Sequence, residues 1–294
     1  MHSSSAAETR PTGAQVEDGR VRRQPGRMAR SPRLILWLSS FVLIAFLTIP
    51  LAAIFIRALP SGEIGDALRD PVVREALTLS FLTTGATLII VIALGTPVAW
   101  LLARYGFRGR DALSTLIELP MVLPPAVAGV ALLMAFGRRG VFGPFLSDTF
   151  GIELPFTTVA VVLAQAFVAA PFYVKSAQAG FASVDPELEH VAATLGLSRV
   201  STFASITVPL ALPALLGGAV MAWARALGEF GATIMFAGNF IGRTQTMPLA
   251  IYQTMESGQL NAALVLSGIL VIVSFTVLIA FKWLAGYAAG GRVR

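Results

Sequence analysis

The sequence predicts an all-α, polytopic membrane protein with six transmembrane helices and a cytoplasmic helix–turn–helix. Of its 294 residues, 55% are hydrophobic and only 13% are charged, and the mean hydropathy is +0.75. A soluble domain carries about a quarter charged residues. The apolar residues also gather in runs of about 20, the length that crosses a bilayer. Arginine and lysine are unevenly divided among the segments between these runs, as expected for a membrane protein of fixed orientation.

Residue types needed for several kinds of chemistry are missing from the chain. There is no cysteine, and the only histidines are His2 and His190. A disulfide framework, a zinc–thiolate site and a catalytic thiol are therefore excluded, and we predict neither a catalytic nor a metal site. The phosphate-binding pattern Gly-x-x-x-x-Gly-Lys-Ser/Thr does not occur. If the protein uses ATP, another chain must hydrolyse it.

The chain divides into a polar tail and one membrane domain. Residues 1–33 are rich in Ser, Arg, Gly and Pro and have no apolar period, which predicts a disordered cytoplasmic tail. A signal peptide is the alternative, but the apolar run after Arg33 is too long for one. Residues 34–294 then form the transmembrane domain. Its spans are expected at residues 34–56, 76–103, 113–136, 157–177, 210–237 and 261–284.

The basic residues predict the orientation of these spans. With the N-terminus inside, the inner segments hold fifteen Arg and Lys residues and the outer segments hold six. When the tail is left out, the inner segments still hold eight Arg and Lys residues against six in the outer segments. Basic residues accumulate on the cytoplasmic side of membrane proteins, so both termini are predicted to be cytoplasmic. The net charge of +6 thus indicates topology, and we expect no nucleic-acid partner.

Between the fourth and fifth spans, residues 185–209 are not apolar enough to cross the membrane. Asp185 suits a helix N-cap and Pro186 the first helical position, while Gly196 suits a left-handed helix C-terminus. Ser198 would cap a second short helix that ends near Pro209. Leu188, Val191, Ala192 and Leu195 would share one face of the first helix. We therefore expect a rigid helix–turn–helix with an apolar stripe available to a partner.

An amphipathic connector lying on lipid headgroups is the alternative for this segment. Such helices carry a basic face, whereas the first helix here has Asp185, Glu187 and Glu189 and no basic residue. This favours docking to a protein. The spacing from Glu189 to Gly196 and on to Ile206-Thr207-Val208-Pro209 resembles the EAA loop of binding-protein-dependent ABC importer permeases. His190 and Val191 stand where that loop has two alanines, and Val208 where it has leucine.

The resemblance implies that residues 185–209 couple the pore to an ATPase subunit. It assigns contact with that subunit to Glu189, His190, Ala193, Leu195 and Gly196. It also implies a second copy of the chain, two ATP-binding cassette subunits and an extracytoplasmic oxyanion-binding protein as partners, besides membrane lipid. ATP and Mg²⁺ would be bound by the ATPase, and this chain would bind no cofactor. The location implied is a bacterial-type cell membrane.

Two further stretches are similar to the molybdate branch of these permeases. They are residues 224–239, continued by 242–252, and residues 119–129 in the third span. The resemblance as a whole covers residues 34–284 and implies import of molybdate, or of tungstate. Sulfate and thiosulfate permeases share an Arg-x-Leu-Gly-Glu segment and remain the alternative.

Charged residues within the fifth span are candidates for the translocation path. Arg225 and Glu229 are four residues apart, so they would share a helix face and pair. A charge at the centre of a span costs about 3 kcal/mol and normally faces the bundle interior or a water-filled path. The pair is either a structural ion pair that fixes helix packing or part of an anion path. Thr233 could add a hydrogen-bond donor toward an oxyanion.

Prolines interrupt the third span. Pro124 and Pro125, with Pro120 and Gly129, should break or kink a helix there. Non-helical backbone within a membrane is tolerated where protein covers it or where it lines a cavity. The interruption is therefore either a simple kink or a gate-lining segment of the path.

Other transport classes fit the sequence less well. A secondary transporter would need internal repeats and intramembrane groups for coupling ions, and only Glu229 qualifies. A channel would have no use for the cytoplasmic helix–turn–helix. A membrane enzyme would need a nucleophile and a base placed together, which the sequence does not suggest.

Overall fold

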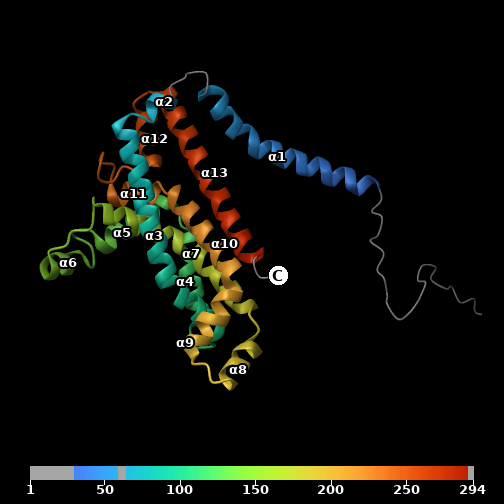
Figure 1. The fold of residues 1–294 in the computed structure, drawn as a ribbon. Helices are drawn as coiled ribbons and strands as arrows, with labels where there is room; N and C mark the ends of the chain where they lie inside the picture. Colours follow the sequence, from blue (N-terminus) through green and yellow to red (C-terminus); the bar gives the residue numbers. More distant parts are fainter. Residues whose placement is uncertain (1–29, 59–63, 291–294) are drawn as a thin grey trace, which may run out of the picture. The chain divides into compact units, whose positions relative to one another are not determined.

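The computed structural model describes residues 30–58 and 64–290, and within these ranges the chain consists of helices without strands. In chain order the helices are α1 (Arg30–Ala58), α2 (Ile64–Ala67), α3 (Pro71–Arg104), α4 (Arg110–Val122), α5 (Pro125–Phe136), α6 (Gly143–Phe150), α7 (Thr158–Ser183), α8 (Pro186–Thr194), α9 (Arg199–Thr202), α10 (Val208–Leu227), α11 (Gly231–Ala237), α12 (Met247–Glu256) and α13 (Leu260–Gly290) (Figure 1). A π-helix over Phe203–Thr207 joins α9 to α10. The predicted tail lies outside the described residues up to residue 29, and α1 begins at Arg30.

Five helical stretches are long and apolar enough to span a membrane: Ile35–Ala58, Pro71–Arg104, Thr158–Ser183, Arg199–Leu227 and Leu260–Trp283. The third predicted span, residues 113–136, is a bent pair, because α4 and α5 meet at an angle of 118°. Proline forces the residue before it out of the helical region, and Leu123, which precedes Pro124, is extended at φ −66° and ψ 135°. Counted as one crossing, the pair completes the six predicted spans.

The chain divides into two compact units, and the part of α1 up to Ala52 belongs to the first of them. The 29 residues of α1 give a length of about 43 Å, which exceeds the roughly 30 Å of a bilayer's hydrocarbon core.

The second unit, residues 53–294, is built around α3, α7 and α10, which lie alongside one another (Figure 1). Small residues permit the close approach of α7 and α10. A Cβ on Gly218 would lie 2.7 Å from the Cβ of Ser176, and one on Gly180 would lie 2.5 Å from the Cβ of Ala214. The Ser176 hydroxyl also donates to the Ala214 carbonyl at 2.7 Å. Small residues and interhelical hydrogen bonds are what hold helices together where burial of apolar surface gives little driving force.

The fifth predicted span is not one helix. We expected it to run without interruption over residues 210–237, but α10 ends at Leu227 and α11 starts at Gly231. Phe230 lies between them at φ −131° and ψ −55°, outside helical geometry. The break falls at Gly228-Glu229-Phe230-Gly231, and small and apolar residues resume directly after it, so the stretch has the length of one span. The break places Glu229 outside both helices.

The helix after the predicted turn also differs from expectation. It does not end near Pro209 but continues from α9 through the π-helix into α10. Proline lacks an N–H, and its ring clashes with the carbonyl four residues earlier in a regular helix. The wider π turn, closed by Val208 N–H to the Phe203 carbonyl, accommodates Pro209 without ending the helix. Helices α8 and α9 lie at one end of the second unit, and α2 and α12 lie at the other (Figure 1).

Candidate functional site

The turn at Gly196 has the geometry that its sequence predicts. Gly196 has φ +85°, a left-handed conformation that glycine adopts without steric cost. Its N–H donates to the Ala193 carbonyl at 3.0 Å, and the Leu197 N–H donates to the Ala192 carbonyl at 3.1 Å. These two bonds form a Schellman motif, which satisfies carbonyls that the end of α8 would otherwise leave free.

Both predicted caps are confirmed as well. The Asp185 carboxylate accepts a hydrogen bond from the Glu187 N–H at 2.9 Å at the start of α8. The Ser198 hydroxyl accepts one from the Ser201 N–H at 3.2 Å at the start of α9. Residues 185–209, hereafter the EAA-like segment, therefore begin with a capped helix and a defined turn.

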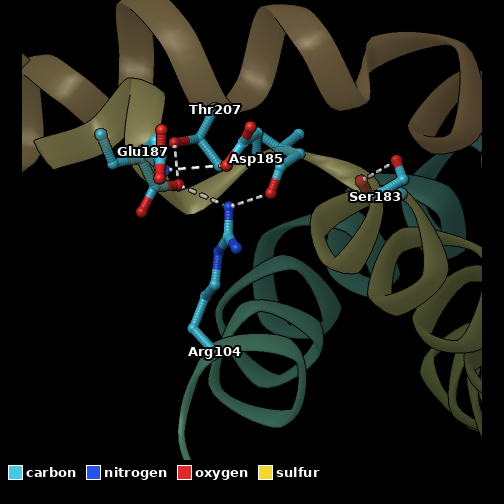
Figure 2. A network of polar contacts seen from close by, with 8 residues as sticks. Arg104, Ser183, Asp185, Glu187 and Thr207 are labelled. Carbon is cyan, nitrogen blue, oxygen red and sulfur yellow. Dashed lines mark hydrogen bonds and ion pairs between the residues drawn. The ribbon is translucent and has the colours of Figure 1, made fainter. Parts of the chain in front are cut away.

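The carboxylate of Glu189 is bonded to the rest of the chain, in the polar network around Arg104 and Thr207 that Figure 2 shows. Its Oε1 lies 2.7 Å from Nη2 of Arg104, at the end of α3, and accepts a hydrogen bond from the Thr207 hydroxyl at 2.8 Å. The same Arg104 nitrogen donates to the Val184 carbonyl at 2.9 Å. The side chains of Arg104 and Glu189 are 12% and 25% exposed. One carboxylate thus joins α8 to α3 and to the π-helix that leads into α10.

The opposite side of α8 is apolar and exposed. Leu188, Val191 and Leu195 are 45%, 58% and 75% exposed, whereas Ala192 is only 3% exposed. The stripe predicted from the sequence is therefore split, because Ala192 packs inward while the three larger side chains face outward. His190 and Ala193 are exposed and line a hollow of about 580 Å³ between this segment and the end of α3.

The second group of predicted residues gathers where two helices break. Arg225 lies in the last turn of α10, and its Nη2 is 2.7 Å from Oε2 of Glu229. The predicted pairing is confirmed, although Glu229 lies outside the helix on which it was expected. The two exposures are unequal, since the Arg225 side chain is 27% exposed and that of Glu229 only 1%. The positive member of the pair is therefore the more exposed one.

Glu229 also contacts the start of α11. Its Oε1 accepts a hydrogen bond from the Ala232 N–H at 2.8 Å, which satisfies one of the free donors at the start of a helix. A carboxylate is favourable there because the helix dipole is positive at that end. Glu229 therefore neutralises Arg225 and fixes the position of α11.

The break after α10 lies against the break before α5. A Cβ on Gly231 would lie 2.7 Å from the Pro125 Cβ, and one on Gly129 would lie 2.9 Å from the Ala232 Cα. Only glycine allows helices α5 and α11 to come this close. Pro124 and Pro125 are exposed. The prolines of the third span and the charges of the fifth, about a hundred residues apart in the sequence, thus belong to one site.

Other side chains complete this region. Thr233 is fully buried, and its hydroxyl has no hydrogen-bond partner within the part of the chain that the structure describes. Phe230 packs on Tyr252 of α12 with ring centroids 4.8 Å apart. The Tyr252 hydroxyl donates to the Glu256 carboxylate, and this bond raises the pKa of Tyr252. The contacts of Gly231 and Tyr252 leave no sign in the sequence, because nothing local marks a contact between distant segments.

Comparison with known proteins agrees with this architecture. The family described as "Binding-protein-dependent transport system inner membrane component" matches residues 95–285. This chain belongs to that family. The permease is therefore a multi-pass membrane protein of a transport system, as its apolar helices indicate.

Relatives of the permease have similar lengths. It is 42% identical to the molybdenum transport system permease protein ModB of Mycobacterium bovis over 84% of this chain and 92% of that protein. It is 36% identical to the molybdate/tungstate transport system permease protein WtpB of Pyrococcus abyssi, over 85% and 94% of the two chains. A bacterial alginate ABC transporter solved with its alginate-bound periplasmic protein has a similar fold, with a TM-score of 0.67 at 15% identity, over 86% of this chain and 93% of that chain.

Proposed function

We propose that the permease forms the pore of an ATP-driven importer of molybdate that also accepts tungstate. The observation that carries this proposal is the 42% identity, over 84% of the chain, to a molybdenum transport permease. The molybdate/tungstate permease of Pyrococcus abyssi supports the inclusion of tungstate. The EAA-like segment supports coupling to an ATPase because its exposed face is apolar and its turn is well defined.

The working assembly contains two copies of this chain, two separate ATP-binding cassette subunits and an extracytoplasmic oxyanion-binding protein. ATP and Mg²⁺ belong to the cassette subunits, and this chain needs no cofactor of its own. Both termini lie in the cytoplasm of a bacterial-type cell, with 1–33 as a tail before the membrane domain 34–294. The excess of basic residues on the inner side supports this orientation.

Arg225 is the residue we propose to meet the oxyanion in the pore. Its guanidinium is partly exposed while its partner Glu229 is buried, so the accessible charge is positive. A guanidinium donates several hydrogen bonds and suits oxyanions. The neighbouring carboxylate weakens the attraction, which a conduit requires because the anion must also leave. The exposed Pro124 and Pro125 line the gate of this path. Thr233, which is buried in this conformation, acts as a donor toward the anion once the helix breaks have rearranged.

Transport then proceeds by alternating access. The binding protein delivers the anion at the outer face while closure of the cassette subunits on ATP moves the EAA-like segment, with Glu189, His190, Ala193, Leu195 and Gly196 in the coupling region. The helix breaks near Arg225 and Pro125 are where the pore opens, because chain that is not helical can rearrange without bending a whole helix.

The decisive experiment is reconstitution of the permease in vesicles with its ATPase and binding protein. ATP hydrolysis is measured after separate addition of molybdate, tungstate and sulfate. Stimulation by molybdate and tungstate, and not by sulfate, is expected. Stimulation by sulfate alone would support an ATP-driven importer but exclude molybdate as its cargo. Uptake without the ATPase would instead indicate an ion-coupled transporter.

A further inference from the structure

The attachment of α8 to the rest of the chain depends mainly on Glu189. Of the nine residues of α8, only Ala192 is buried, so burial of side chains contributes little to holding this helix. Glu189 by contrast makes an ion pair to Arg104 at 2.7 Å and accepts a hydrogen bond from Thr207 at 2.8 Å. Charge-assisted hydrogen bonds are about twice as strong as neutral ones. The contacts of the Glu189 side chain with Arg104 and Thr207, hereafter the Glu189 tie, are therefore the principal attachment of α8 to the rest of the chain.

The groups that Glu189 joins lie at the ends of two long helices. Arg104 is the last residue of α3, and Thr207 is the last residue of the π-helix before α10. α10 ends with Arg225 in its last turn. At the rise per residue of an α-helix, Thr207 and Arg225 lie about 27 Å apart along the axis of α10. A displacement of α8 that is transmitted to Thr207 is thus carried along α10 to the break at Glu229.

We propose that Arg104 and Glu189 are positioning residues that transmit movement of the coupling helix to α3 and α10. Glu189 acts within the permease, and the exposed apolar side chains of α8 provide the contact with the ATPase. This inference rests on the proposed function for its transport consequence. The tie itself is a property of this chain alone.

The first test measures the tie without any transport. Hydrogen exchange of the α8 amides is followed in the purified full-length permease and in the variants Glu189→Gln, Arg104→Gln and Thr207→Val. Loss of a charge-assisted hydrogen bond should raise exchange in α8 about tenfold in the two charge variants, and less in Thr207→Val. Unchanged exchange in both charge variants would overturn the proposal.

The second test measures coupling in the reconstituted importer. The stimulation of ATP hydrolysis by molybdate-loaded binding protein should fall about fivefold or more in Glu189→Gln and in Arg104→Gln, while co-purification with the ATPase stays normal. The double variant should be no worse than either single variant, because both remove one interaction. If Glu189→Gln impairs coupling and Arg104→Gln does not, Glu189 acts on the ATPase directly and the proposal is wrong.

The ion pair between Lys175 and Glu118 provides a matched control. It has the same 2.7 Å separation and links α7 to α4 without touching the EAA-like segment. Lys175→Gln should leave both α8 exchange and stimulation unchanged. Equal effects in this control would also refute the specific role of Arg104 and Glu189. If no oxyanion stimulates the wild-type importer, the proposed function fails while hydrogen exchange still decides the tie.

Discussion

Substitution of Gly129 by alanine tests whether the contact between α5 and α11 holds the two helix breaks together. The added Cβ would lie 2.6 Å from the Met235 Cβ, 2.8 Å from the Ala232 carbonyl oxygen and 2.9 Å from the Ala232 Cα. Carbon atoms in contact are normally about 3.5–4.0 Å apart. Since two of these atoms belong to the backbone, no rotamer change relieves the overlap, and α5 and α11 must separate.

The expected loss of stability follows from two opposing terms. Overpacking of this kind costs up to about 3 kcal/mol, and replacing glycine by alanine inside a helix gains about 1 kcal/mol. The net destabilisation is about 2 kcal/mol. At about 2–4 °C per kcal/mol for a domain slightly smaller than this one, the thermal midpoint should fall by about 4–8 °C.

The assay is thermal unfolding of the detergent-purified protein at one fixed scan rate, since unfolding of such proteins is often irreversible. Gly85→Ala is the matched control, because Gly85 also lies within a helix but a Cβ there meets nothing within 4 Å. The control midpoint should be equal to or above that of the wild type. An unchanged or higher midpoint for Gly129→Ala, or an equal fall in both variants, would refute the reasoning.

Three further perturbations have expected outcomes. Arg225→Gln should lower the thermal midpoint more than Glu229→Gln does, because it leaves a 1%-exposed carboxylate unpaired, at a cost of about 3 kcal/mol; the reverse order would contradict the pairing. Gly196→Pro should abolish uptake with normal membrane insertion, because proline cannot adopt φ +85°; normal uptake would exclude a coupling role for this turn. Leu195→Asp should prevent co-purification of the ATPase with less than about 0.5 kcal/mol change in stability, and retained binding would place the contact elsewhere.

Composition and local spacing are enough to predict the class of protein and the positions of its caps and turns. Apolar runs of span length cannot be buried by a soluble chain of this size, so membrane spans follow from composition alone. The caps at Asp185 and Ser198 and the turn at Gly196 were also predictable, because capping depends on residues within one helical turn. The pairing of Arg225 with Glu229 follows for the same reason, since four residues separate them.

Contacts between distant residues, by contrast, depend on how the helices pack and are seen in the folded chain alone. The partner of Glu189 is Arg104, 85 residues away, and no feature of either neighbourhood indicates the other. The contact of Gly231 with Pro125 is equally long-range. The break at Glu229 is not predicted because apolar residues resume directly after Gly231, so residues 210–237 have the length of one span. The folded chain reveals that break through the carboxylate that caps α11.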